Sequence, residues 1–142
     1  MGLFAKKVQG FAPAIQTQGE GDAGNDANPP PLLVADELPE GFVYPRGLLR
    51  LVELDLCDLE PWLILTGHQL RSRNHGLAER YPDRNLIPFA RRQDNDAVAC
   101  WDVGTGTVAI VHDFASPGWE NQGEFEHFDA WLHSAIEDLI EF

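Results

Sequence analysis

The sequence predicts an α+β fold, with a mainly antiparallel sheet of roughly four to six strands flanked by helices. Three observations lead to this prediction. Strand-like apolar runs follow one another between residues 86 and 114, and short turn sequences join them. The last segment of the chain, by contrast, has apolar residues at the three-and-four spacing of an amphipathic helix. Strands in sequence with a helix after them are typical of this fold class.

The first 31 residues are predicted to form a flexible or weakly ordered tail. Residues 19–31, GEGDAGNDANPPP, combine Gly, Asp, Asn and Pro without a large aliphatic side chain. Such a segment cannot bury enough apolar surface to offset the entropy of ordering. The chain has 142 residues, of which 44% are apolar, so it is about one domain long and can form a core. A single folded domain is therefore expected over residues 32–142.

The first half of this domain contains fewer clear signals. PRGLLRLVELD, residues 45–55, is compatible with a helix, and Pro45 suits its first turn. Residues 62–65, WLIL, indicate a short buried strand. Residues 68–85 are polar and arginine-rich and are interrupted by Gly76 and Pro82. We expect one or two short helices there, followed by a loop.

Three strands are predicted in LIPFA (86–90), AVACWDV (97–103) and TVAIVHDF (107–114). The GTG sequence at 104–106 is expected to form the hairpin turn between the last two, because glycine tolerates positive φ. Alternate residues of both strands are apolar on each face, which predicts a sheet covered on both sides. The amphipathic segment from 125 to 140 is expected to supply one of these covers.

Composition and charge exclude several classes of partner. The formal net charge is −13 and the pI is near 4.5, which argues against direct binding to nucleic acid or to an anionic membrane. No apolar run approaches the ~18 residues of a membrane-spanning helix, and the N-terminus lacks the apolar core of a signal peptide. A cytoplasmic location is expected. Cys57 and Cys100 stand alone in apolar stretches and are expected to be reduced and buried.

The carboxylates of Asp94 and Asp96 are the first candidates for chemistry. With Asn95 they could offer oxygen ligands to a hard cation, because residues two apart in an extended segment face the same side. The segment lacks the Gly and the later Glu of a calcium loop. The favoured interpretation is a corner between two strands, where these side chains bond to nearby backbone.

No other motif indicates an enzyme. The five histidines do not form HxH, HExxH or a Cys/His cluster with zinc spacing, and GxSxG, Walker and GxGxxG motifs are absent. We therefore expect no catalytic residues, no metal and no cofactor. A carboxylate-metal enzyme is the least favoured hypothesis.

Charge is distributed unevenly along the chain. Six arginines lie between residues 71 and 92, whereas no Lys or Arg follows Gln93. The acidic residues after that point are Asp94, Asp96, Asp102, Asp113, Glu120, Glu124, Glu126, Asp129, Glu137, Asp138 and Glu141. They could form an ordinary solvated face, or a surface that attracts a strongly basic partner. Trp119, in the loop SPGWENQG, could close the end of the sheet or anchor an interface.

The order and spacing of four segments resemble the SUKH superfamily, which includes fungal cell-wall regulators and many bacterial immunity proteins. These segments are LPEGF (38–42), EPWLIL (60–65), residues 86–114 and FEHFDAWLHSAIEDLI (125–140). The resemblance covers residues 32–142. It implies an α+β fold and, for bacterial members, neutralisation of a toxin, often a nuclease, by direct binding. The chain departs from the family in lacking an Asn-Gly-Gly turn after the first helix, and in having Asp-Asn-Asp where many relatives have glycines.

The sequence thus suggests an immunity-type protein that binds a basic protein toxin, with a nuclease as the expected target. A regulatory scaffold or adaptor of the same fold is the alternative. The family provides no catalytic or toxin-binding motif to carry over, so the expected contact residues come from the charge pattern and the aromatic loop. They are Asp94, Asp96, Asp113, Trp119, Glu120 and Glu124.

Overall fold

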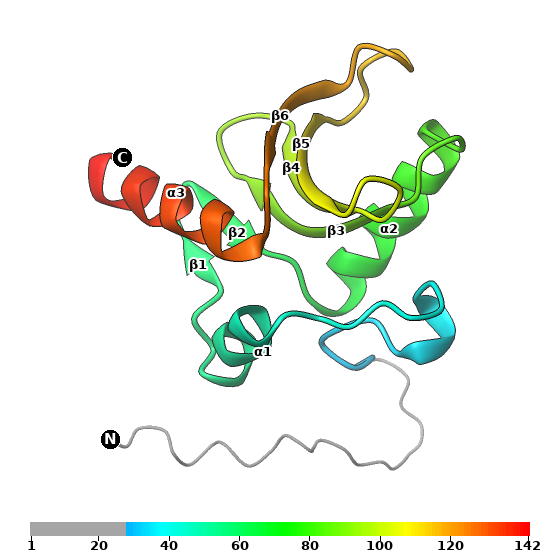
Figure 1. Cartoon of the computed structure of the whole chain (residues 1–142). Coiled ribbons are helices and arrows are strands. Elements are labelled where there is room, and N and C mark those ends of the chain that lie inside the picture. The colour runs from blue at the N-terminus through cyan, green and yellow to red at the C-terminus, as the bar shows by residue number, and fades with distance from the viewer. Residues whose placement is uncertain (1–27) are drawn as a thin grey trace. The chain divides into compact units, whose positions relative to one another are not determined.

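A computed structural model describes residues 28–142, and Figure 1 shows it as a ribbon. The chain divides into two compact units, Met1–Leu56 and Cys57–Phe142. The tail predicted for residues 1–31 lies outside the described residues except for its last four positions. The described part of the first unit holds a short 3₁₀ helix, η3 (Ala35–Glu37), and helix α1 (Arg46–Glu53). The helix predicted for residues 45–55 is present as α1, but Pro45 is its N-cap instead of a residue of its first turn.

The second unit is built on a six-stranded antiparallel sheet, which confirms the predicted α+β class. The strands are β1 (Asp58–Leu59), β2 (Trp62–Ile64), β3 (Leu86–Arg92), β4 (Ala97–Asp102), β5 (Thr107–His112) and β6 (Asn121–Phe125). They pair in chain order, and each pairs with its neighbour in antiparallel orientation. Helix α2 (Gly67–Arg80) connects β2 to β3, and helix α3 (Phe128–Glu141) follows β6.

Both faces of the sheet are covered, as the apolar alternation predicted. On one face, Leu77 and Tyr81, at the end of α2, join a buried cluster with Val98 and Cys100 of β4. On the other face, Trp131 of α3 packs edge-on against Phe89 of β3, with ring centroids 4.8 Å apart. Neighbouring residues of β4 point to opposite faces, and the four residues from Ala97 to Cys100 are all buried, so both faces of this strand are covered.

Several elements differ from the sequence prediction. Of the one or two short helices expected before a loop, the chain forms one, α2, which is longer than expected because it runs through Gly76. It ends at Arg80 because Tyr81 precedes Pro82 and is disfavoured in the helical conformation. Strand β6 occupies part of the stretch expected to be a loop, and α3 begins three residues later than the predicted segment. The sequence of β6, NQGEF, has no apolar alternation, so backbone pairing with β5 defines this strand. The short strand β1 was also not predicted.

The two cysteines are free. Cys100 is fully buried, and burial raises the pKa of its thiol, which therefore stays protonated at neutral pH. Cys57 is only half-buried, in contrast to the prediction. None of the helices within residues 28–142 has the length and apolar character that crossing a membrane requires.

Candidate functional site

The corner between β3 and β4 contains Asp94, Asn95 and Asp96, as predicted. The side-chain oxygen of Asn95 accepts a hydrogen bond of 2.8 Å from the backbone N–H of Ala97, where β4 begins. Both carboxylate oxygens of Asp94 accept from Arg92, at 2.8 and 2.9 Å. This pairing holds the pKa of Asp94 below its ordinary value. Within residues 28–142, no group of three or more His, Cys, Asp or Glu side chains is arranged to hold a metal ion.

Asp113, one of the expected contact residues, lies inside the second unit instead of on its surface. Its side chain is fully buried directly after β5. It accepts a hydrogen bond from Arg73, two from Arg80 and one from the backbone N–H of Phe114, all between 2.6 and 2.8 Å. Burial alone would raise the pKa of this carboxyl, but the bonds from Arg80 and Arg73 hold it below its ordinary value.

Glu120 is also buried and paired. Its carboxylate accepts from Arg84 at 2.8 Å and from the backbone N–H of Gly118 at 2.7 Å. Burial opposes ionisation, but these hydrogen bonds lower the pKa of Glu120 overall. The same Arg84 guanidinium binds Asp102 at 2.9 Å, so it connects the end of β4 with the residue that precedes β6. Glu120 therefore holds the β5–β6 connection in place, and its carboxylate is not available to a partner.

The remaining expected contact residues are exposed, but they do not all lie together. Trp119 is 81% exposed, so it does not close the end of the sheet. Asp96 is exposed, and its carbonyl accepts from the backbone N–H of Asp113, which places the corner beside the connection that carries Trp119. Glu124 lies further along β6, where it accepts a 2.7 Å hydrogen bond from the Thr107 hydroxyl near the β4–β5 turn. The predicted residues do not form one continuous patch.

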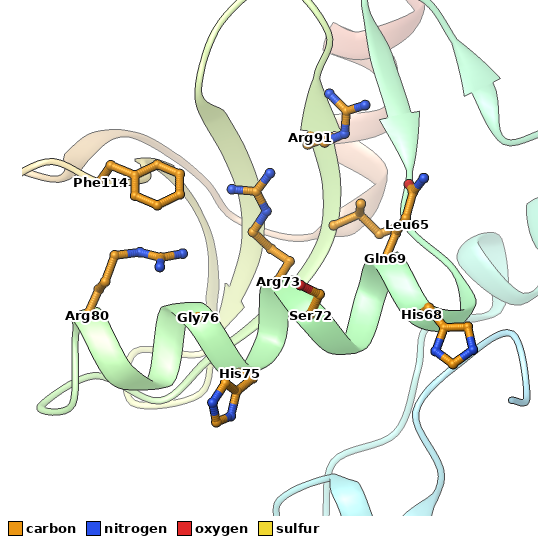
Figure 2. A pocket seen from close by; sticks show the side chains of 10 residues that line it. All are labelled: Leu65, His68, Gln69, Ser72, Arg73, His75, Gly76, Arg80, Arg91 and Phe114. Carbon is orange, nitrogen blue, oxygen red and sulfur yellow. The ribbon is translucent and has the colours of Figure 1, made fainter. Parts of the chain in front are cut away.

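The structure shows a second candidate site that the sequence did not predict. A cavity of about 620 Å³ lies between α2, Arg91 of β3 and Phe114. Figure 2 shows Arg73 and Arg91 extending on the same side of α2, with the Phe114 ring beside Arg80. The guanidinium carbon of Arg80 lies 4.0 Å from the centre of that ring, a cation–π contact. Phe114 has a φ of +72°, in the left-handed region that non-glycine residues rarely adopt.

This cavity is cationic although the protein as a whole is acidic. Three arginines line it, and Asp113 is the carboxylate that pairs with two of them. Arg91 makes one hydrogen bond, of 3.3 Å, to the Arg92 carbonyl, and the described residues offer it no carboxylate partner. The only signal in the sequence was the arginine spacing in residues 71–92, and it did not reveal which arginines carboxylates would neutralise.

Comparisons with known proteins give no assignment: no family model, curated protein or solved structure matches the chain.

Proposed function

We propose that this protein is a non-catalytic immunity protein of the SUKH type, which neutralises a basic toxin, with a nuclease as the expected target, by direct binding. In this proposal it acts in the cytoplasm. The main support is a set of exposed carboxylates in the last third of the chain. These residues have no cationic side-chain partner within residues 28–142: Asp96, Glu124, Glu126, Asp129, Glu137 and Glu141.

Ion pairing separates these carboxylates from the rest of the acidic residues. Asp94, Asp102, Asp113, Glu120 and Asp138 pair with arginines of the preceding segment. The second unit contains six arginines and fifteen Asp and Glu residues, a formal charge of −9. An excess of negative charge of this size destabilises the fold, because the carboxylates repel one another. It also increases the rate of encounter with a basic partner.

Trp119 gives the proposed surface an anchor. Its side chain stands in the connection between β5 and β6, where Glu120 and Arg84 fix the adjacent backbone. A rigid aromatic on a fixed loop loses little conformational entropy on binding, and tryptophan is enriched among the residues that dominate interface energies. The acidic Asp96 lies at the same end of the sheet. We propose that Trp119 and Asp96 meet the toxin, with Asp94 at the rim.

The function is tested by co-expression with the toxin module encoded beside this gene. Cells that express the module should survive when the intact protein is present and die when it is absent. Rescue that is lost with Trp119→Ala, in a variant that remains folded, would support direct neutralisation. Survival that does not depend on this protein, or the absence of a toxin module beside the gene, would favour the regulatory scaffold instead.

The electrostatic part of the proposal is tested by binding kinetics with the purified toxin module. The association rate should fall at least tenfold between 0.02 and 0.15 M salt. Asp96→Lys and Glu124→Lys should slow association more than they speed dissociation. The matched control is Asp36→Lys, which makes the same charge change at an exposed residue of the first unit. Rates that are indifferent to salt and to these substitutions would contradict the proposal.

A further inference from the structure

We propose that the cavity beside α2 binds the phosphate group of a small phosphate monoester. This inference does not depend on the proposed toxin binding. It rests on the composition of the cavity, which three arginines line, while a single buried carboxylate, that of Asp113, pairs with two of them. The arginines and this carboxylate leave a local excess of two positive charges in a chain with a net charge of −13.

The hydrogen-bond donors of the cavity are not all in use. Arg73 donates to Asp113 only through Nη1, which leaves its Nε and Nη2 groups without a partner within residues 28–142. Arg91 has its single 3.3 Å bond to a backbone carbonyl. Ser72 and Gln69 also line the cavity, and the described residues give neither side chain a hydrogen-bond partner. Free hydrogen-bond donors in a positively charged cavity favour an anionic ligand whose oxygens only accept hydrogen bonds.

Phosphate fits this donor set better than a carboxylate does. A phosphate monoester carries a charge of about −1.5 to −2 at neutral pH and three strong acceptor oxygens. This charge matches the local excess, and the three oxygens match the forks of Arg73 and Arg91 together with the Ser72 hydroxyl. A carboxylate brings one charge and two oxygens, and would leave part of the excess unneutralised.

The size and wall of the cavity favour a phosphate that carries an organic group. A volume of about 620 Å³ is far larger than a bare phosphate needs, and lies in the range of small-molecule sites. Phe114 lines the cavity, the residue is 64% exposed, and its backbone is held in a left-handed conformation. Strained residues of this kind cluster at ligand sites. The Phe114 ring is placed to contact the organic part of the ligand.

The test is titration calorimetry of the full chain, in a buffer without phosphate, with phenyl phosphate, inorganic phosphate and benzoate. We expect both phosphates to bind, and benzoate to bind at least tenfold more weakly than phenyl phosphate. Tighter binding of phenyl phosphate than of inorganic phosphate would assign an ester, and equal affinities would assign free phosphate. Failure of both phosphates to bind, or binding of benzoate as tight as that of phenyl phosphate, would overturn the proposal.

A pair of variants tests the location of the site. Arg91→Gln should weaken phenyl phosphate at least tenfold, because it removes one charged fork from the ligand. Arg46→Gln is the control, since it removes the same charge from an exposed residue of the first unit. In the wild-type chain, phenyl phosphate should shift amide NMR signals of α2, Arg91 and Phe114. The site would be contradicted if both variants lost affinity for phenyl phosphate equally, or if Arg91→Gln kept the wild-type affinity. It would also be contradicted if the shifted NMR signals came from elsewhere in the chain.

Discussion

Asp113 shows how one residue can hold several elements of the second unit together. Its carboxylate accepts from Arg73 and Arg80 of α2, although 40 and 33 positions separate these residues from it in the sequence. The two arginines keep 22% and 30% of their side-chain surface, whereas the carboxylate has none. A buried carboxylate that solvent cannot reach stays ionised only when cationic or hydrogen-bonding partners stabilise its charge. The stability of the second unit therefore depends on the pairing of Asp113 with these arginines.

We expect Asp113→Asn to lower the free energy of unfolding by about 3 kcal/mol at pH 7, because two arginines would lose their anion. The depressed pKa of Asp113 adds a pH dependence. Its stabilising effect is present above the unfolded pKa of about 4 and is lost as pH falls through the lower folded pKa. The difference between wild type and variant, measured by urea denaturation, should therefore shrink below about pH 4. Asp96→Asn, at an exposed carboxylate, is the control and should change stability by less than about 0.5 kcal/mol.

Gly76 lies in the middle of α2, where alanine would normally stabilise a helix by about 1 kcal/mol. Here a Cβ atom would lie 2.5 Å from Nη2 of Arg80, the atom that donates to Asp113. The Arg80 side chain would have to move, and its charged hydrogen bonds would weaken. We expect Gly76→Ala to destabilise the protein by about 1 kcal/mol net.

A double-mutant cycle separates these two effects of Gly76→Ala. In an Arg80→Ala background the clash is absent, so the same substitution should stabilise the protein by up to about 1 kcal/mol. Urea denaturation of the four proteins measures the change of sign. The same effect of Gly76→Ala in both backgrounds would show that Arg80 does not explain the glycine.

At the scale of elements, the connection between β5 and β6 is held by side chains more than by regular structure. Arg84 binds Glu120, and Glu120 accepts from the backbone N–H of Gly118, next to the exposed Trp119. Gly118 has a φ of +97°, a conformation that favours glycine. The loop that carries Trp119 therefore depends on Arg84, which lies 36 positions before Glu120 in the sequence.

We expect Arg84→Ala to increase amide hydrogen exchange of Gly118 and Trp119 at least tenfold, because the buried Glu120 carboxylate would lose its cation. The free energy of unfolding should fall by about 2 kcal/mol, less than the ~3–5 kcal/mol typical of a fully buried pair, because the Arg84 side chain keeps 23% of its surface exposed. Arg91→Gln removes an arginine without a described carboxylate partner and should leave exchange in this loop unchanged. Unchanged exchange in Arg84→Ala would show that Glu120 does not hold the connection.

Folding changes how the charge pattern of the protein is interpreted. Along the sequence, cations end at Arg92 and acids dominate afterwards, which suggested either a solvated acidic face or a surface that attracts a basic partner. In the structure, Arg73, Arg80, Arg84 and Arg92 reach across to acids of the later segment. What remains exposed is a smaller set of unpaired carboxylates, together with a cationic cavity beside α2.

The fold class, the main strands of the sheet and the amphipathic helix could be predicted from the sequence, because hydrophobic periodicity and turn residues are local properties that neighbouring residues encode. It also predicted that Asn95 lies at a strand corner. The burial of Asp113 and Glu120 and the pairing of NQGEF as a strand became clear only from the three-dimensional arrangement. The same is true of which arginines lack a carboxylate partner among the described residues. The ion pairs of Asp113 and Glu120 join residues 33 to 40 positions apart, and β6 pairs with residues of β5 that lie 10 to 17 positions before it. No local pattern encodes which distant partner a charge or a strand will meet.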